Sequence, residues 1–368
     1  MTKLLTDQEA LEALCRALTK ASWVGLDTEF VRERTYYAEL CLVQLALPDA
    51  LVLVDPLQVD LRPLAQAFRA PGLKIVHAGR QDLELLLQET EDLPAPLFDT
   101  QIAAALVGHH DQIGYANLVA QLLSIELNKD ATRTNWALRP LSERQLAYAQ
   151  DDVRYLDVLH DKLASELVRL GRMDWLSEDC QALTDPSLYR FHSDQLVHRY
   201  RQGASLSPAG QAIFQDLLVW REAAAKETNL PRNWVFPDSV LAELAAHPPK
   251  NRAELAARRG LNHQSIERWG DALMTTVGGA EDSPRRAWAL PRLDSEEERL
   301  YTAFVAHVDA CAKALAIEAG VICSRRALKE MVQGGPAGNL ARGWRAEVLG
   351  PHGAHLLAEV LGLHAQSA

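Results

Sequence analysis

Acidic side chains in short patterns mark the first half of the chain. Asp27 and Glu29 are two residues apart at the end of a run that predicts a strand, so both point to one face, while Val24, Leu26 and Thr28 face the other way. Carboxylates that converge on one point provide the hard oxygen ligands that Mg²⁺ and Mn²⁺ prefer. Taken alone, a D-x-E pattern more often marks a strand edge that enters a polar loop.

Two further positions extend this pattern. Asp82 follows the apolar run 74–78 and lies in the first turn of a predicted helix, where an acidic residue also stabilises the helix dipole. Tyr148 and Asp152 are four residues apart on a long predicted helix and therefore share a face on the flank of its apolar stripe. Asp151 is predicted to point to water. Phosphodiester hydrolysis by two metal ions needs oxygen ligands from several elements, which this order of strand, helix and helix could supply.

The elements that must position these residues alternate between strands and helices. We predict strands at 22–27, 39–47, 50–54 and 73–77, helices near 80–88, 100–107 and 116–123, and one long helix from Ser142 to Leu170. Thr6-x-x-Glu9 and Ser142-x-x-Gln145 have the form of helix capping boxes. Pro48-Asp49 between two apolar runs predicts a hairpin and hence an antiparallel pair. The first half is therefore predicted to be an α/β domain with a mixed sheet and flanking helices.

The second half is predicted to be entirely helical. Residues 235–244 resemble residues 322–331 at an offset of 87, and a long amphipathic helix and a short loop precede each segment, which predicts two small helical bundles. Gly, Pro and Ser residues interrupt the apolar periodicity before and between these blocks. We therefore predict domains at 1–185, 209–280 and 294–368, joined by linkers at 186–208 and 281–293.

Composition excludes several classes of protein. The 368 residues carry a net charge of −11, all of it within residues 1–190, so this is no basic protein that coats nucleic acid. An acidic half is either a solvated surface or a set of carboxylates that hold cations. No apolar run is long enough for a membrane span, and no apolar signal core stands at the N-terminus. Five scattered cysteines without a C-x-x-C pair favour a reducing cytoplasm over a disulfide framework.

The acidic motifs resemble those of the DEDD exonucleases, in the subclass with tyrosine in the third motif. The matches are D-x-E at Asp27, H-A-x-x-x-D-L from His77, and Y-x-x-x-D from Tyr148; the sister subclass has His where this chain has Ala147. Segments 27–37, 42–45, 98–101 and 135–145 are similar to the ribonuclease D family. The helical blocks resemble the helicase-and-RNase-D C-terminal (HRDC) domain, the second more weakly than the first.

This resemblance implies an RNase H-like (DnaQ-like exonuclease) mixed sheet, followed by two HRDC bundles. It implies a 3′–5′ exoribonuclease that uses two divalent ions, Mg²⁺ or Mn²⁺, and releases nucleoside 5′-monophosphates. Asp27 would bridge both ions, Glu29 and Asp152 would complete the site of the ion that activates water, and Asp82 would support the second ion. Tyr148 would orient the attacking water. His77 is expected to stabilise its motif, since imidazole is a softer ligand than this site requires.

The implied partner is RNA, especially tRNA precursors during 3′ maturation and small structured RNAs, with no obligate protein partner. Cationic and aromatic side chains after the metal motif suit phosphates and unstacked bases: Phe30, Arg32, Arg34 and Tyr36. A surface loop without a ligand is the alternative for this segment. Trp136 either borders the RNA 3′ end or packs on the core. A DNA 3′–5′ exonuclease with the same metal core and a catalytically degenerate nucleic-acid-binding module remain the alternative functions.

Overall fold

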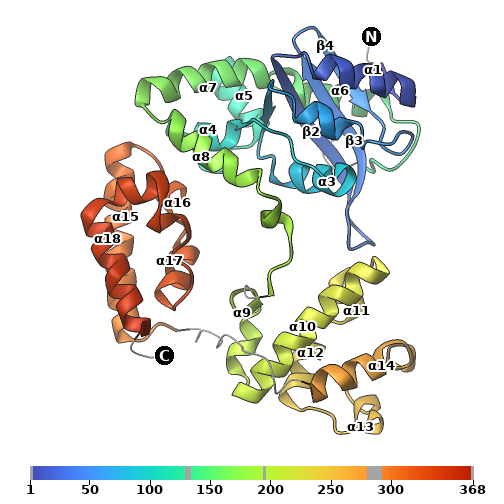
Figure 1. The fold of residues 1–368 in the computed structure, drawn as a ribbon, viewed down its shortest axis with the longest axis vertical. Coiled ribbons are helices and arrows are strands. Elements are labelled where there is room, and N and C mark those ends of the chain that lie inside the picture. The colour runs from blue at the N-terminus through green and yellow to red at the C-terminus, as the bar shows by residue number, and fades with distance from the viewer. Residues whose placement is uncertain (1–2, 129–133, 194–195, 280–291, 366–368) are drawn as a thin grey trace.

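A mixed β-sheet forms the centre of the α/β domain, residues 3–185 (Figure 1). The computed structural model describes residues 3–128, 134–193, 196–279 and 292–365. The six strands of the described residues have the order β1-β4-β3-β2-β5-β6. Their bounds are β1 Lys3–Leu5, β2 Trp23–Val31, β3 Glu39–Leu47, β4 Ala50–Val54, β5 Leu73–Val76 and β6 Leu97–Asp99. Strand β2 pairs antiparallel with β3 and parallel with β5, so the predicted mixed sheet is confirmed.

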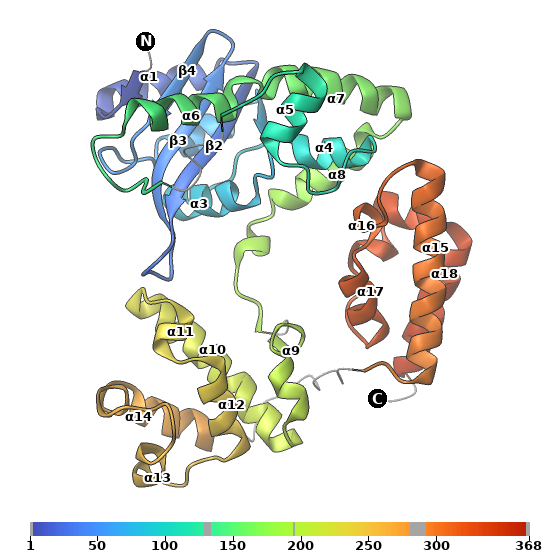
Figure 2. The ribbon, with the colours of Figure 1, turned by 180° about the vertical axis from the view of Figure 1, so that it is seen from behind.

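Helices cover both faces of this sheet. Helices α1 (Gln8–Leu18), α2 (Leu64–Phe68) and α3 (Arg80–Thr90) bury their apolar residues against one face, together with Val24 and Leu26 of β2. Helices α6 (Glu143–Arg154) and α7 (Leu156–Leu170) cover the other face, as Figure 2 shows for α6. Helices α4 (Thr100–Leu106), α5 (Tyr115–Leu123) and α8 (Met173–Leu183) complete the domain.

Two local predictions are wrong, and each has a physical reason. The predicted helix from Ser142 to Leu170 divides at Tyr155, where φ is −111° and ψ is 8°. The Tyr155 N–H donates to the hydroxyl of Tyr115 at 3.1 Å instead of continuing the helical pattern. At the N-terminus Asp7, not Thr6, caps α1, because its carboxylate accepts from the N–H of Ala10. The capping box at Ser142 is confirmed.

The two helical bundles repeat the same elements at the predicted offset of 87 residues. The first begins with α10 (Pro208–Thr228), α11 (Arg232–Val235) and α12 (Asp238–Ala246), and the second with α15 (Ser295–Leu315), α16 (Ala319–Ile322) and α17 (Arg325–Val332). Both long helices end in a left-handed residue, Asn229 at φ 49° and Ala316 at φ 53°. The bundles then diverge, into α13 (Arg252–Ala256) and α14 (His263–Gly278) in one and α18 (Gly343–Ala365) in the other.

The segments between these blocks are only partly described. Residues 186–208 contain the short helices η1 (Pro186–Tyr189), α9 (Leu196–Arg199) and η3 (Arg201–Ser205). The predicted linker at 281–293 falls almost entirely outside the described residues. In the part of the chain that is described, no helix combines the length and the apolarity needed to cross a bilayer.

The two bundles are attached to the α/β domain in different ways. The second bundle shares one continuous hydrophobic core with it, and the rings of Trp175 in α8 and Trp344 in α18 stack at 4.6 Å. The first bundle (residues 208–279) has its own core, with Phe214 and Leu217 at its centre. Figure 1 shows it beneath the α/β domain, facing the loop between β2 and β3.

Candidate active site

Carboxylates from three elements meet beside the centre of the sheet. Asp27 and Glu29 stand on β2, and a register shift follows Glu29, so the strand changes course immediately after the second carboxylate. Strand β5 runs parallel to β2 and leads through a short turn into α3, which carries Asp82. Helix α6 crosses β2 and carries Asp152.

Burial and mutual repulsion raise the pKa values of these carboxylates. Burial, and then the charges of Asp82, Asp152 and Glu29, raise the pKa of Asp27 well above its usual value. Burial and the charges of Asp152 and Asp82 raise the pKa of Glu29 to about 8. Burial raises the pKa of both Asp82 and Asp152 to about 7. Carboxylates in such a place repel one another unless positive charge is supplied to them.

Two hydroxyl groups hold these carboxylates in place. Thr28 donates from Oγ1 to Oδ1 of Asp82, although strand alternation puts Thr28 on the opposite face from Asp27 and Glu29. Tyr148 forms a side-chain hydrogen bond with Asp152 on the same helix face, as their spacing predicts. The role of Thr28 was not predictable from the sequence, because its contact with Asp82 depends on where α3 packs.

The turn that presents Asp82 is fixed by Asp99 at the end of β6. Its carboxylate accepts from the N–H groups of Ala78 at 3.0 Å and Gly79 at 2.9 Å, and Ala78 adopts a left-handed φ of 54°. His77 contacts Thr100 Oγ1 and the carbonyl oxygen of Ile113, both at 2.9 Å. Both ring nitrogens are therefore occupied, so the structure favours the predicted stabilising role for His77. The role of Asp99 has no signal beyond its place in the segment 98–101.

Trp136 packs on the core, which was one of its two predicted placements. It is 2% exposed, and its ring centroid lies 6.1 Å from that of Tyr148, so little of its surface is open to an RNA base. The alternative in which Trp136 borders the RNA 3′ end is thus not supported. Arg139 anchors this segment, because its guanidinium binds both oxygens of the buried Asp55 at 2.6 Å and the carbonyl of Trp136 at 2.7 Å.

The loop between β2 and β3 (residues 32–38) contacts the first bundle. The Tyr36 hydroxyl donates to Glu222 of α10, Arg232 of α11 binds the same carboxylate, and the N–H of Tyr37 donates to Asn229 at 3.1 Å. Tyr36 therefore serves as an interdomain contact, a role that the sequence did not predict. Arg34 is exposed on this loop.

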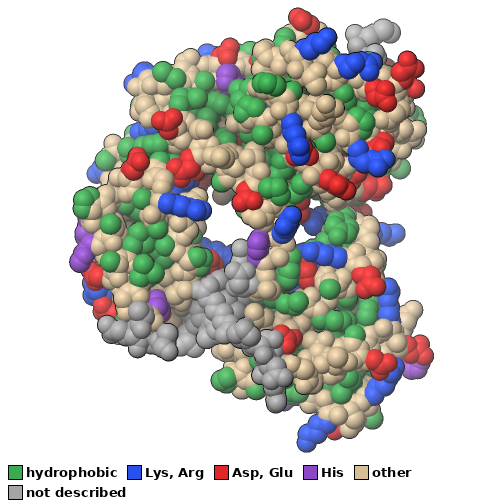
Figure 3. Space-filling view, in the orientation of Figure 1, with side chains coloured by type: hydrophobic (Ala, Val, Ile, Leu, Met, Phe, Trp, Pro, Cys, Tyr) green, Lys and Arg blue, Asp and Glu red, His purple; other side chains and the backbone are tan. Residues whose placement is uncertain are grey.

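A cleft opens between the α/β domain and both bundles. Figure 3 shows the molecule hollowed there, with Lys and Arg side chains at the border. Its lining includes Phe30 and Arg80, which are close in sequence to Glu29 and Asp82, and continues along the linker at Tyr189 and Arg190. Arg32 also lines it, whereas Arg34 does not. Cationic and aromatic side chains thus line a cleft near the segments that carry Glu29 and Asp82.

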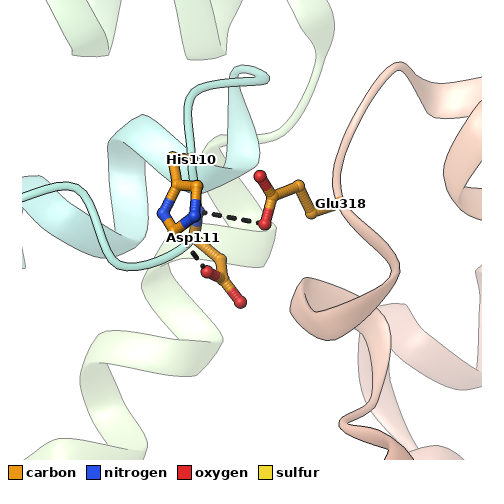
Figure 4. Close-up of side chains that lie close together, drawn as sticks. All are labelled: His110, Asp111 and Glu318. Atoms are coloured by element: carbon orange, nitrogen blue, oxygen red, sulfur yellow. Dashed lines mark hydrogen bonds and ion pairs between the residues drawn. The ribbon is translucent and has the colours of Figure 1, made fainter.

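The donor set fits divalent cations. Its possible ligands are all carboxylate oxygens, which hard cations prefer, and the side-chain charges that raise the pKa of Asp27 and Glu29, after burial, are all acidic. Only one group of three among the described residues brings its possible ligand atoms within 4.8 Å of one another: His110, Asp111 and Glu318 (Figure 4). This group lies at the surface, where the N–H of Asp111 donates to Glu318 at 3.5 Å. We interpret it as a contact between the α/β domain and the second bundle.

The sheet order and the carboxylate cluster define the class of 3′–5′ exonucleases. A family model described as 3′-5′ exonuclease matches residues 2–168, and one described as HRDC domain matches residues 210–277.

Relatives that match most or all of the chain narrow the class of exonuclease to one family. The chain is 41% identical to ribonuclease D of Zymomonas mobilis over 76% of this chain and 72% of that protein. It is 37% identical to ribonuclease D of Jannaschia sp. over 100% and 98% of the two chains. The crystal structure of Escherichia coli RNase D, described as an exoribonuclease involved in structured RNA processing, matches with a TM-score of 0.86 and 32% identity, over 98% of this chain and 99% of that one. The chain belongs to the ribonuclease D family, and the activity of that family is exoribonucleolytic hydrolysis.

Proposed function

We propose that Asp27, Glu29, Asp82 and Asp152 hold two divalent ions, Mg²⁺ or Mn²⁺, for the hydrolysis of RNA from its 3′ end. The observation that carries this proposal is the meeting of four carboxylates from β2, α3 and α6, of which Asp82 is buried and the other three are half-buried, each with a raised pKa. When bound, two such ions supply a hydroxide at neutral pH and stabilise charge on the attacking and leaving oxygens.

Side chains of the protein would hold the ions and orient the attacking water. Asp27 would hold both ions, because the charges of the other three carboxylates all raise its pKa. Tyr148 is held by its hydrogen bond to Asp152. With a reference pKa near 10, the phenol is a poor base at neutral pH, so it orients the attacking water. Water attacks the last phosphodiester, the 3′ oxygen of the preceding nucleotide leaves, and a nucleoside 5′-monophosphate is released.

The cleft suggests the route of the substrate. Phe30 and Tyr189 offer faces for unstacked bases, and Arg32, Arg80 and Arg190 offer positive charge to phosphates. A cleft bordered by three separate parts of the chain suits a single-stranded 3′ end that projects from a folded RNA. We infer that tRNA precursors and other small structured RNAs are the substrates, and that domains 209–280 and 294–368 position them.

The decisive experiment compares substitutions that preserve side-chain shape. Asp27→Asn and Asp152→Asn are expected to abolish hydrolysis of a 3′-extended tRNA while RNA binding survives, and Tyr148→Phe is expected to slow it by about 10²–10⁴-fold. Asp151→Asn is the matched control, because Asp151 neighbours Asp152 but pairs with Arg154 at 2.8 Å. EDTA should stop the reaction, and Mg²⁺ or Mn²⁺ should restore it.

The same assay separates the alternatives. Near-normal turnover by Asp27→Asn would refute the metal assignment. Equal digestion of matched RNA and DNA oligonucleotides would favour a broader 3′–5′ exonuclease. Absence of any product with Mn²⁺ would indicate a binding module that has lost catalysis.

A further inference from the structure

Gln44 lies directly opposite Asp27 in the central antiparallel pair of the sheet. The register of β2 and β3 places these two residues as cross-strand partners. Side chains at such positions point to the same face, with Cβ atoms about 4.5–5.5 Å apart. Gln44 therefore shares the face of Asp27 and Glu29, and helix α6, which carries Tyr148, covers it (Figure 2).

The amide of Gln44 is buried without a hydrogen bond. The residue is 0% exposed, and neither Nε2 nor Oε1 has a partner among the described residues. The cross-strand partner of Gln44 on β4 is Leu53, and Leu42 and Ala46 lie two residues before and after Gln44 on β3. A buried amide that lacks a partner costs about 1–3 kcal/mol, whereas Leu or Met would fill the same volume without that cost. Packing alone therefore does not explain a glutamine here.

The surroundings of Asp27 show what such an amide could contribute. The side chains that act on Asp27 through charge are Asp82, Asp152 and Glu29, and all three are acidic. None of them can donate a hydrogen bond to Asp27 when ionised. Gln44 is neutral, carries two N–H donors and stands within one cross-strand spacing of the carboxylate. It can therefore hold the ionised form of Asp27 without adding charge to the site.

We propose that Gln44 is a positioning residue for Asp27, and that its Nε2 group donates to the Asp27 carboxylate in the working enzyme. This contact fixes the direction in which the bridging carboxylate presents its oxygens to the cations. Partners of this kind, which orient a metal ligand, typically contribute 10–100-fold to metal affinity or activity. The inference rests on the proposed function of Asp27 as a metal ligand.

The test substitutes Gln44→Met, which keeps the volume and removes the amide. We expect Mn²⁺ binding, measured by electron paramagnetic resonance, to weaken by about 10–100-fold. The unfolding temperature in EDTA should not fall, because an orphaned polar group has been removed. Leu45→Met is the matched control: the adjacent residue on β3 is buried in the opposite face, and its variant should bind Mn²⁺ as the wild type does. Unchanged Mn²⁺ affinity in Gln44→Met would overturn the inference.

Asp27→Asn, measured in parallel, separates this inference from the proposed function. If Asp27→Asn retains metal binding and turnover, the function proposed for Asp27 fails. If Asp27→Asn loses both while Gln44→Met keeps both, only the role of Gln44 is refuted. Should Gln44→Met not fold, the wild-type protein still decides: its Gln44 side-chain amide signals in NMR, assigned by their loss in Gln44→Glu, must shift on addition of Mg²⁺. Signals that do not move would also overturn the inference.

Discussion

At the scale of single residues, the carboxylates of the candidate site hold their protons more tightly than ordinary carboxylates do. Glu29, Asp82 and Asp152 have pKa values of about 8, 7 and 7, compared with reference values near 4 in an unfolded chain. The folded protein therefore retains protons near neutral pH that the unfolded chain releases. Under the proposed function, the same side chains link the stability of the fold to metal binding.

This linkage predicts a dependence of stability on pH. A raised folded-state pKa favours folding below the unfolded-state pKa, and this contribution is lost as the pH rises through the folded-state values. In EDTA, the unfolding temperature should therefore fall between pH 5 and pH 9, and Mg²⁺ should reduce that fall. Calorimetry of the wild type and of Asp82→Asn at several pH values measures it; the variant should show a shallower fall. An equally steep fall in the variant would contradict the assignment.

Spacing in the sequence predicted which acidic side chains share a face, and the resemblance to the DEDD motifs joined them into one site, but neither predicted the residues that support them. The acidic positions were predictable because alternation in a strand and the i, i+4 spacing of a helix are local properties. Thr28, Asp99 and Gln44 act across the sheet or across a turn. Their contacts depend on strand register and on helix packing, which a single sequence does not specify.

At the scale of elements, one segment without helix or strand is held by a buried ion pair. Arg139 links β4, through Asp55, to the backbone of the segment that carries Trp136, and Asp55 is 1% exposed. This segment immediately precedes α6. The position of Tyr148 and Asp152 therefore depends on an anchor outside their own helix.

Removal of one partner of the Arg139–Asp55 ion pair should destabilise the folded protein. Arg139→Ala leaves the Asp55 carboxylate buried without its charge partner, and we expect a loss of about 3–5 kcal/mol in the free energy of unfolding. Arg62→Ala is the control, because Arg62 pairs with Asp60 in solvent, and such pairs contribute at most about 1 kcal/mol. Urea denaturation of both variants measures the difference. Equal losses would show that Arg139 does not anchor the segment.

Two short strands and the division of one helix were not predictable from the local sequence pattern. Strands β1 and β6 are three residues long, too short for a recognisable alternation. The long helix divides at Tyr155 because the hydroxyl of Tyr115 is available as an acceptor. In contrast, the repeat at an offset of 87 was predictable, since residues 235–244 resemble residues 322–331 in sequence, and the helices of the two bundles begin at the same offset.

At the scale of the whole molecule, the two bundles differ in how strongly they are attached. The second shares a hydrophobic core with the α/β domain, and Arg345 of α18 pairs with Asp179 of α8. The first bundle contacts the α/β domain through the loop between β2 and β3, where the hydroxyl of Tyr36 donates a hydrogen bond to Glu222. The molecule therefore combines one fused unit with one separately folded bundle.

Trp344→Ala should loosen the fused unit. Truncation of a buried tryptophan that stacks on Trp175 should cost about 3–5 kcal/mol, and the second bundle should become more sensitive to limited proteolysis. Trp234→Ala is the control, because that ring in the first bundle is 57% exposed. Proteolysis profiles that do not differ between the two variants would contradict a shared core.

The contact between Tyr36 and Glu222 constrains how such a chain can be recombined. A chimera that receives the first bundle from a relative must also receive the β2–β3 loop, since each side of this contact is useful only with its counterpart. That loop follows Val31, the last residue of β2 and two residues after Glu29, so a graft that does not fit would distort the strand that bears two of the acidic groups. A change in the first bundle can therefore affect β2, the strand that carries Asp27 and Glu29.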